Sequence, residues 1–545
     1  MREKNREIPK SYGIEDEMAM YKLWEDSGYF NPDNIKTKKH PFVMTLPPPN
    51  ANGELHVGHM CGYSFQDAMG RYNRMKGRPT LLLAGKDHAG IQTEAVFTKI
   101  LKKEGIDKWK LGREEFYKRA YNFCIKNADH ARDQEKRIGL SADWSREKFT
   151  LDPKLSEIVF ETFCKMFDEG QIYRGSYLIN QCTSCKTALA DVDTDHVMKK
   201  GIFAYIKYPV VGSKDEFVTV ATTRPETMLG DTAVAVNPKD KRLKKYVGKI
   251  VELPLTGRQI PVIEDESIDM DLGAGALKVT PAHSSIDFEL GQKHGLEVMN
   301  VIDEEGKMNK NVPDKYQGMS VTECRDEVLK DLEEQGYLDK VEDIQHEVIV
   351  CERCQSDIEQ IISKQWFVNV DPLAKKVLNA LDEKPTKGGS ASGGKTQIVP
   401  KFQEGIFRHW FENIRPWCIS RQLWWGHRIP IWYCGGKELY DWLIDNEGKT
   451  VEDYEKEIGK KSKGCGCAIA SVEKPNGCGK CKECKRENCE CGDFEQETDV
   501  FDTWFSSGQW NFSTLGGING EDFKKFYPTD VMETMHDILF FWVAR

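Results

Sequence analysis

The chain lacks the long apolar stretches that a membrane protein needs. No apolar run in its 545 residues approaches the roughly 20 residues that cross a bilayer as a helix. The N-terminus, Met1 to Glu7, is too highly charged for a secretory signal peptide. These absences argue against a transmembrane or secreted protein, and we expect a cytoplasmic protein with no membrane partner.

An excess of positive charge is also missing. The formal net charge is −10, with 77 Lys and Arg against 87 Asp and Glu, whereas a nucleic-acid partner needs local positive charge. Net charge does not exclude local basic patches. Two segments rich in lysine and arginine, 239–245 and 480–486, are candidates, although most such runs are simply solvated surface.

Disorder is not indicated by the composition. Hydrophobic residues make up 39% of the chain and charged residues 30%, which is typical of a folded globular enzyme. The length allows three or more domains that each bury a core of their own.

Cysteine, in contrast, is abundant. A reducing compartment keeps thiols free, so the 17 cysteines favour metal sites over disulfides. Two CxxC pairs, Cys182 with Cys185 and Cys351 with Cys354, have the spacing of a four-thiolate structural zinc site. The alternative is two unrelated reduced pairs. Eight further cysteines lie between Cys434 and Cys491.

The segment Pro47 to His59 is the most informative stretch of the sequence. It joins an apolar strand, 42–46, to a helix that begins near Leu55, with His56 and His59 three residues apart. Backbone N–H groups and the helix dipole at such a start favour phosphate, and both imidazoles can donate to it. Gly58 leaves room for a flat base. A bare HxxH pattern is otherwise compatible with surface polarity or a metal pair.

The elements that follow predict an α/β fold. A buried strand over 80–84, the turn Gly85 to Gly90 and a helix near Ile91 continue the pattern of strand and helix. This order is typical of a doubly wound parallel, Rossmann-like sheet, in which ligands bind beyond the carboxyl ends of the strands. The His56 and Asp87 loops both occupy that position.

A second domain interrupts the first. From about His196 the sequence changes to alternating strands, and near Ser363 the first pattern returns, which indicates a β-rich α+β insertion. We predict the first half of the α/β domain at 1–180, zinc-bound, ribbon-like linkers at 181–195 and 346–362, the inserted domain at 196–345, and the second half at 363–545 with a cysteine-rich insert at 434–491.

Several long motifs together resemble the class I aminoacyl-tRNA synthetases, in particular their valine-specific branch. Besides Pro47 to His59, the matching segments span nearly the whole chain: Gly85 to Ile91, Ala142 to Arg146, Thr222 to Asp231, Lys278 to His283, Ile414 to Gln422 and Asp499 to Ser507. The resemblance implies ATP-dependent activation of valine, its attachment to tRNA(Val), and hydrolytic editing of mischarged Thr-tRNA(Val) in the inserted domain.

The resemblance assigns residues to the activation site. His56 and His59 would be catalytic, with Mg²⁺ assisting the departing pyrophosphate, and the ATP-binding set would be Asn50, Gly53, His56, Gly58 and His59. The valine-binding set would be Pro48, Asp87, Trp504 and Ile538, with Asp87 on the substrate ammonium. For Asp87 the alternative is turn formation or helix capping; for Trp504 it is simple core packing.

The resemblance likewise assigns an editing site: Thr222, Arg224, Thr227, Lys278 and Asp287. Asp287 would accept the substrate ammonium or hydroxyl, and Arg224 and Lys278 would hold the terminal adenosine and its phosphate. The alternative for Asp287 is a carboxylate in the first turn of a helix. Ser284 departs from the family, which usually has an acidic residue directly after Pro-Ala-His, and this departure affects the expected selectivity for threonine.

The cysteine-rich insert departs from the two cysteine pairs of the family, since Lys437 stands where a partner of Cys434 is expected. We predict Cys478, Cys481, Cys489 and Cys491 as a second set of zinc ligands. The Lys-Met-Ser-Lys-Ser loop, the anticodon-binding domain and the C-terminal coiled coil of the family are not in the sequence. We therefore expect an incomplete, monomeric enzyme. The alternatives are a fragment with deacylase activity alone and a non-enzymatic zinc-ribbon protein that binds nucleic acid.

Overall fold

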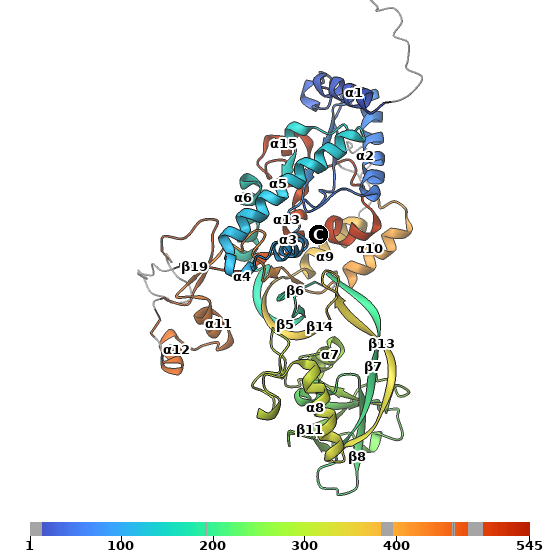
Figure 1. Ribbon diagram of the computed structural model, residues 1–545, viewed down its shortest axis with the longest axis vertical. Coiled ribbons are helices and arrows are strands. Elements are labelled where there is room, and N and C mark those ends of the chain that lie inside the picture. Colours follow the sequence, from blue (N-terminus) through green and yellow to red (C-terminus); the bar gives the residue numbers. More distant parts are fainter. Residues whose placement is uncertain (1–12, 191–192, 383–395, 460, 463, 478–493) are drawn as a thin grey trace, which may run out of the picture. The chain divides into compact units, whose positions relative to one another are not determined.

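The computed structural model describes residues 13–190, 193–382, 396–459, 461–462, 464–477 and 494–545. The chain divides into two compact units (Figure 1): unit 1 comprises Met1–Tyr173 and Phe367–Arg545, and unit 2 is Arg174–Trp366. The ranges 181–195 and 346–362, predicted as linkers between domains, belong to unit 2 in this division.

Unit 1 is built on parallel strands. Strand β1 (Phe42–Thr45) pairs in parallel with β2 (Thr80–Leu83), and helix α2 (Val57–Met75) connects them. A parallel bridge from Met44 to Val531 adds a segment from the far end of the sequence beside β1. This strand, helix, strand connection is the unit from which parallel α/β sheets are made.

Both faces of the β1–β2 pair are buried, which accounts for the nearly continuous apolar sequences of these strands. On one face, Met44 and Leu82 pack in a cluster with Tyr63 of α2. On the other face, Val43 and Leu81 pack in a cluster with residues 515 and 526 from the second half of the unit. A sheet covered on both faces is the arrangement that the sequence predicted, and the α/β class is confirmed.

The remaining elements of unit 1 come from both halves of its sequence. In the first half they are α1 (Ile14–Asp26), η1 (Pro32–Asn34), β3 (Gly85–Lys86), α3 (Gly90–Lys103), α4 (Lys108–Leu111), α5 (Arg113–Arg137), η2 (Trp144–Arg146), β4 (Lys148–Phe149) and α6 (Pro153–Asp168). In the second half they are α9 (Asp371–Asp382), α10 (Phe402–Glu412), β15 (Trp417–Cys418), β16 (Ser420–Arg421), β17 (Ile431–Cys434), α11 (Lys437–Asp445), α12 (Val451–Ile458), β18 (Ala468–Ala470), β19 (Phe494–Gln496), β20 (Val500–Phe501), α13 (Thr503–Ser507), α14 (Trp510–Ser513), α15 (Glu521–Phe526) and the short helical segments η7 (His536–Ile538) and η8 (Leu539–Ala544).

Unit 2 is rich in strands, as the alternating sequence predicts. A long antiparallel ribbon of β7 (Thr194–Pro209) and β13 (Leu338–Cys351) is extended by β8 (Phe217–Thr222) (Figure 1). A four-stranded sheet has the order β10-β11-β9-β12, with β9 (Ala233–Val236) parallel to β11 (Gln259–Glu264) and antiparallel to β12 (Ala276–Val279). Alanines of β9 pack with Val279 and with Leu290 of α7 (Ser285–His294).

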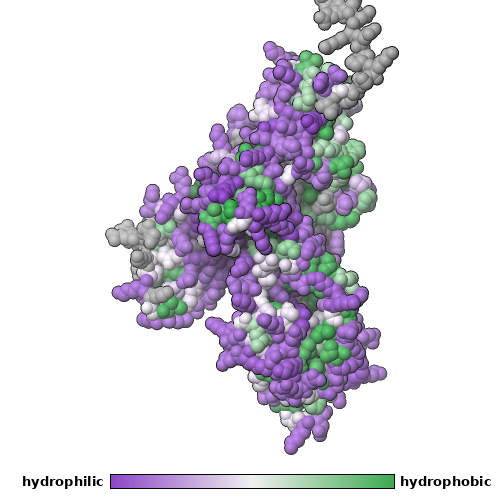
Figure 2. Space-filling view, in the orientation of Figure 1, coloured by the Kyte–Doolittle hydropathy of each residue, from purple (hydrophilic) through white to green (hydrophobic). Residues whose placement is uncertain are grey.

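The other elements of unit 2 are β5 (Ile172–Cys182), β6 (Thr187–Leu189), η4 (Pro225–Gly230), η5 (Lys244–Tyr246), β10 (Ile250–Glu252), η6 (Asp314–Tyr316), α8 (Val321–Glu334) and β14 (Ile358–Val368). Strands β5 and β14 each run across a boundary between the two units. Hydrophilic residues cover much of the visible face, with smaller apolar patches among them (Figure 2). Across the described ranges, none of the helices has both the length and the apolar character required to cross a membrane.

Candidate functional site

The two predicted loops of unit 1 are joined by their backbones. The N–H of Asp87 donates to the carbonyl of Pro49 at 2.8 Å, and the N–H of Ala51 donates to the carbonyl of Asp87 at 2.8 Å. These bonds form a parallel bridge between Asn50 and Asp87. The loop after β1 and the loop after β2 therefore lie side by side, as expected at the carboxyl ends of neighbouring parallel strands.

His56 and His59 lie at the start of α2, where the sequence predicts the beginning of a helix. His56 is the N-cap: its Nδ1 accepts from the N–H of Gly58 at 3.1 Å, and the N–H of His56 donates to Nδ1 of His59 at 3.3 Å. A neutral imidazole that accepts at Nδ1 carries its proton on Nε2. Each ring thus keeps an Nε2–H that can donate to a phosphate oxygen.

The charge state of His59 supports the same role. The two ring centroids are 4.0 Å apart. Burial, followed by the neighbouring His56, lowers the pKa of His59. A neutral His59 ring is compatible with the predicted donation to phosphate.

Gly58 lies between the two histidines, and the structure shows a steric reason for glycine at this position that the sequence did not reveal. A Cβ on Gly58 would lie 2.9 Å from Cε1 of His56, which is shorter than real Cβ contacts allow. Any side chain would displace the capping imidazole. Gly53, in contrast, faces open space: a Cβ at this position would have no atom within 4 Å.

Asp87 is a buried carboxylate surrounded by hydrogen-bond donors. Ser507 donates to Oδ2 at 2.6 Å, and the Ala89 N–H and the Thr150 hydroxyl contact Oδ1 at 3.1 and 3.2 Å. Burial by itself would raise the pKa of Asp87, but the hydrogen bond and charge of His88, with further hydrogen bonds, hold it below its usual value. An ionised carboxylate in this place can bind an ammonium group.

The residues around Asp87 were only partly predicted. Thr503 and Ser507, which contact the carboxylate from α13, lie within the Asp499 to Ser507 motif, so the motif was a signal for them. Thr150 had no such signal. Its role depends on the fold bringing β4 beside β3.

Besides the buried Asp87, the predicted valine-binding residues come from three segments of unit 1, and these three residues, Pro48, Trp504 and Ile538, are half-buried. Pro48 precedes the residue that bonds to Asp87, and Trp504 lies between Thr503 and Ser507. Ile538 ends η7, and the segment after it contacts α13 through the Trp504 and Phe541 rings, whose centroids are 5.7 Å apart. Their role as walls of a valine pocket stays a prediction.

Unit 2 contains a cavity of about 670 Å³, and all five predicted editing residues line it: Thr222, Arg224, Thr227, Lys278 and Asp287. They come from the end of β8, from the η4 region, from β12 and from α7. Leu272 and Ile286 add exposed apolar side chains to the lining. A concave, mostly apolar site with a few converging polar groups is typical of a small-ligand site.

Lys278 is held by groups inside the protein. Its ammonium lies 2.8 Å from Thr227 Oγ1, 2.7 Å from Thr280 Oγ1 and 3.3 Å from Asp231 Oδ1. An ammonium has three protons, so these contacts use all of them. Binding of a phosphate by Lys278, as predicted, would require one contact to be exchanged.

Arg224, unlike Lys278, is partly exposed. Its Nε donates to Glu226 at 3.0 Å, and another guanidinium nitrogen pairs with Glu359. About a quarter of the side-chain surface, 27%, is exposed. Glu226 is in turn held by Arg325 of α8 at 2.8 Å. A guanidinium has five N–H donors, so Arg224 retains donors that can reach a ligand.

Asp287 and Ser284 act together at the start of α7. Ser284 is the N-cap and its Oγ accepts from the N–H of Asp287 at 3.3 Å, while Asp287 Oδ2 accepts from the N–H of Thr280 at 2.8 Å. Burial is the main cause that raises the pKa of Asp287. Asp287 is a buried member of the cavity wall, and Ser284 has a capping role that explains a serine at this position.

His283 also lines the cavity, although the sequence did not single it out. Its Nδ1–H donates to the carbonyl of Gln360 at 2.9 Å, and its Nε2 accepts from the N–H of Val301 at 2.9 Å. Both ring nitrogens are thus used in holding unit 2 together. Burial lowers the pKa of His283 to about 3, so the ring is neutral.

This buried imidazole leads us to expect a loss of stability in acid. An unfolded histidine titrates near about 6.5, so between this value and about 3 the unfolded chain binds a proton that folded His283 does not. Stability therefore rises with pH across this window and falls on acidification. The contribution of this group at pH 5 is lower than at pH 8 by about 2 kcal/mol.

Thermal unfolding at pH 8 and pH 5 measures the effect. His283→Gln should lower stability at both values but reduce the difference between them, because glutamine does not titrate. An unchanged difference in the variant would contradict the assignment.

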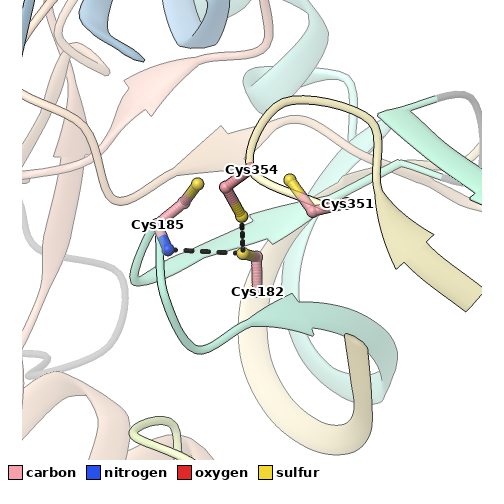
Figure 3. A group of neighbouring side chains, drawn as sticks. All are labelled: Cys182, Cys185, Cys351 and Cys354. Atoms are coloured by element: carbon pink, nitrogen blue, oxygen red, sulfur yellow. Dashed lines mark hydrogen bonds between the residues drawn. The ribbon is translucent and has the colours of Figure 1, made fainter. Parts of the chain in front are cut away.

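The four paired cysteines of unit 2 converge on one point (Figure 3). Their sulfur atoms all lie within 4.8 Å of one another, and the sulfurs of Cys182 and Cys354 are 3.5 Å apart. Four thiolates about 2.3 Å from one zinc ion would be roughly 3.8 Å from each other. The two pairs form a single cluster whose dimensions suit a tetrahedral metal.

A second cluster forms in unit 1 from cysteines that were not predicted as ligands. Cys434, Cys465 and Cys467 are buried with their sulfurs within 4.8 Å of one another, and the N–H of Cys465 contacts the sulfur of Cys434 at 3.5 Å. Lys437 pairs instead with Glu497 at 2.9 Å. The predicted ligands Cys478, Cys481, Cys489 and Cys491, and the basic segment 480–486, lie outside the described residues.

Comparison with known proteins gives a consistent assignment. The family model for tRNA synthetases class I (I, L, M and V) matches residues 19–545. The chain is 43% identical to valine–tRNA ligase of Clostridium acetobutylicum (99% of this chain, 56% of that protein) and 44% identical to that of Dehalococcoides mccartyi (99% and 56%). It is 44% identical to the chloroplastic/mitochondrial valine–tRNA ligase 2 of Arabidopsis thaliana (99% and 51%).

The chain spans about half the length of the curated relatives it matches. A crystal structure of the ternary complex of Agrobacterium radiobacter K84 agnB2 LeuRS-tRNA-LeuAMS covers 95% of this chain and 62% of that one, at 15% identity and a TM-score of 0.41, values too low to support a structural argument. The family match alone covers nearly all of the chain. The chain therefore belongs to the class I tRNA synthetases (I, L, M and V).

Proposed function

We propose that this chain is part of a valine–tRNA ligase, and that unit 1 binds ATP and valine for the activation step. The observation that carries the proposal is the pairing of the two loops: the buried carboxylate of Asp87 lies beside the loop that leads to the imidazole-capped start of α2. The chain shares 43% identity with a relative of this name over almost its entire length.

In this mechanism the protein positions the reactants and stabilises charge, because nucleotidyl transfer needs little covalent chemistry from the enzyme. Asp87 accepts the substrate ammonium and so places the carboxylate of valine near the α-phosphate. The Nε2–H groups of His56 and His59 donate to the phosphate oxygens as negative charge develops. Mg²⁺ bound to the phosphates of ATP would supply positive charge for the departing pyrophosphate.

Binding of aminoacyl adenylate analogues tests this proposal directly on the 545-residue chain. Calorimetry with 5′-O-(N-(L-valyl)sulfamoyl)adenosine should give the tightest binding, with the isoleucyl analogue weaker because one more methylene must fit the pocket. Preference for the isoleucyl analogue, or no binding of either, would contradict the proposal. Valine-dependent pyrophosphate exchange then separates a chain that activates valine from one that retains only the hydrolytic site.

We further propose that the cavity of unit 2 hydrolyses threonyl-tRNA(Val). Threonine is nearly isosteric with valine, and valine-specific synthetases are an established case in which an apolar pocket discriminates by only about 10², so that a second, hydrolytic site is required. The cavity, with its apolar wall and the polar groups of Arg224 and Asp287, supports this proposal.

Deacylation assays test the second proposal. The chain should hydrolyse Thr-tRNA(Val) faster than Val-tRNA(Val), and faster than the spontaneous rate. A chain that binds tRNA without hydrolysing either substrate would favour the zinc-ribbon alternative. Hydrolysis without adenylate binding would favour the deacylase fragment.

We also propose that Cys182, Cys185, Cys351 and Cys354 bind a structural zinc ion. Zinc bound by four thiolates is redox-inert and contributes folding energy, with apparent values of about 10–16 kcal/mol for small zinc peptides at pH 7. The ligands would fix the end of β5 to the end of β13. Zinc in the Cys434 cluster is proposed on the same chemistry.

Removal of this zinc should have a measurable effect on unit 2. Cys351→Ser is expected to lower the zinc content by one ion per chain in native mass spectrometry, and to lower the temperature of thermal unfolding. Cys324→Ser is the matched control, because Cys324 is buried in the same unit outside the cluster. Equal zinc content in wild type and Cys351→Ser would contradict the site.

A further inference from the structure

Two neighbouring residues of helix α5, Gln134 and Glu135, contact the two loops of the proposed activation site and have no role in the assignments made so far. Gln134 Oε1 accepts from the N–H of Leu55, which directly precedes the histidine N-cap of α2, at 2.9 Å. Glu135 Oε2 accepts from the ammonium of Lys86, which directly precedes Asp87, at 2.8 Å. This pair of residues, the α5 step, thus holds each loop at the residue before a predicted functional side chain.

Lys86 belongs to a buried network of alternating charge. Both Lys86 and Glu135 are almost fully buried. The Lys86 ammonium also lies 3.0 Å from Oε1 of Glu147, and Glu147 pairs in turn with Arg132, which is again on α5. Burial raises the pKa of Glu135, and the Lys86 ammonium opposes this effect. The beginning of the Asp87 loop is therefore fixed to α5 by ion pairs.

The carboxylate of Glu135 also faces helix α2. Tyr63 is buried and lies four residues, about one helical turn, beyond His59. Burial, followed by the negative charge of Glu135, raises the pKa of Tyr63 well above its usual value. Leu55 and Tyr63 precede and follow the two predicted phosphate-binding histidines in the sequence. The α5 step therefore contacts the chain on both sides of these histidines.

The backbone bridge between the loops fixes a different point. It joins them at Asn50 and Asp87. Leu55 lies further along the first loop, and its N–H finds an acceptor in Gln134. The bridge therefore fixes where the two loops meet, whereas the α5 step fixes where the first loop turns into α2.

Stability alone does not account for the buried charges of the α5 step. Replacing a buried ion pair by apolar side chains of similar volume is often neutral or stabilising, so the Lys86–Glu135 pair is weak evidence for a purely structural role. The adjacent Gln134 is half-buried and holds the other loop. Two neighbouring residues with one loop each are better explained by a requirement for fixed geometry between the loops.

We propose that Gln134 and Glu135 are positioning residues that set the distance between the ATP-binding loop and the valine-binding loop, an inference that rests on the proposed activation function of unit 1. Gln134 acts on the approach to His56. Glu135 acts through Lys86 on the approach to Asp87. Neither residue of the α5 step touches the substrate. Their effect falls on a ligand that occupies both loops at once.

The test compares the affinities of the whole chain for valine, for ATP and for the valyl-sulfamoyl-adenosine analogue by isothermal titration. Linking two ligands in one molecule raises affinity by about 10²–10⁴, but only if the geometry allows both parts to bind together. Gln134→Leu removes the acceptor of the Leu55 N–H at similar volume, and Glu135→Gln removes a charge at similar shape. In each variant we expect the analogue to bind about 10- to 100-fold more weakly, with wild-type affinity for valine alone and for ATP alone.

Glu497→Gln is the matched control for the loss of charge. Glu497 is a buried glutamate of unit 1 that likewise contacts a lysine, Lys437 at 2.9 Å, and a tyrosine hydroxyl, Tyr433 at 2.5 Å. These partners belong to α11 and β17 rather than to the two loops. Glu497→Gln should bind all three ligands as the wild type does. A loss of analogue affinity equal to that of Glu135→Gln would overturn the proposal.

A general loss of folded protein gives a different pattern, because it weakens valine, ATP and the analogue by the same factor. Equal weakening of this kind in Gln134→Leu and Glu135→Gln would show a merely structural role and overturn the inference. Because Gln134 is only half-buried, Gln134→Leu decides the question if Glu135→Gln does not fold. Failure of the wild-type chain to bind the analogue would remove the activation function itself, whereas wild-type analogue affinity in both variants would remove only the role of the α5 step.

Discussion

Replacement of Asp287 by alanine is expected to abolish the hydrolysis of Thr-tRNA(Val), with a fall in kcat of at least about 100-fold, or about 2.7 kcal/mol of transition-state stabilisation. Asp287 is a buried carboxylate of the cavity wall, and one of its oxygens is already held by the N–H of Thr280. Hydrogen bonds to charged groups contribute about 1.5–3 kcal/mol each. Loss of the carboxylate would leave the substrate ammonium without its counterion.

Two further variants separate this effect from loss of structure. Asp287→Ala also deprives the Thr280 N–H of its acceptor, at a cost of about 1–3 kcal/mol in stability, whereas Asp287→Asn can keep that hydrogen bond and lose only the charge. Glu289→Ala, at an exposed position two residues along the same helix, is the control and should hydrolyse normally. Hydrolysis at the wild-type rate by Asp287→Ala would refute the role of this residue.

Much of the structure around the His56 and Asp87 loops could be predicted from local sequence patterns. The two strands and the helix were predicted within a few residues of β1, β2 and α2, because apolar runs and helical periodicity are local signals. The segment predicted as the turn Gly85 to Gly90 begins instead with the short strand β3. The exact place of His56 was not predictable in this way. Histidine is not a usual N-cap, and its role follows from the mutual bonding with His59 and the clearance left by Gly58.

The residues that surround the buried carboxylates of Asp87 and Asp287 could not all be predicted from the sequence. Asp87 and Asp287 were predicted from motifs, but Thr150, whose hydroxyl contacts Asp87, acquires its role only from a contact across the fold. Thr150 and Asp87 are 63 positions apart in the sequence. No periodicity or spacing rule links such positions.

Metal ligands illustrate the same limit. The spacing of two CxxC pairs was a sufficient signal for a shared site, because each pair forms its own tight turn. In the cysteine-rich insert, eight candidates offered many combinations, and Cys434 lies more than 30 residues before Cys465. The folding of α11 and α12 between them brings the two together, which spacing alone did not indicate.

Asp87→Asn is expected to weaken binding of the valyl-sulfamoyl-adenosine analogue by at least about 100-fold, equivalent to about 2.7 kcal/mol. The ionised carboxylate is held in place by Ser507 and Ala89, and burial strengthens its attraction for an ammonium group. Ser507→Ala removes one of these hydrogen bonds and should give a smaller loss of affinity. Asp67→Asn is the control, because this carboxylate binds Ser141 and Arg71 away from the two loops.

The comparison of two ligands decides whether Asp87 acts as proposed. Asp87 is assigned to the amino acid and His59 to the phosphates, so Asp87→Asn should leave ATP binding unchanged, whereas His59→Ala should weaken it. Isothermal titration of each variant with ATP and with the valyl analogue measures both effects. If Asp87→Asn weakened ATP and the analogue equally, the carboxylate would be supporting the loop through its bonds to Ala89 and Ser507 rather than binding the ammonium of valine.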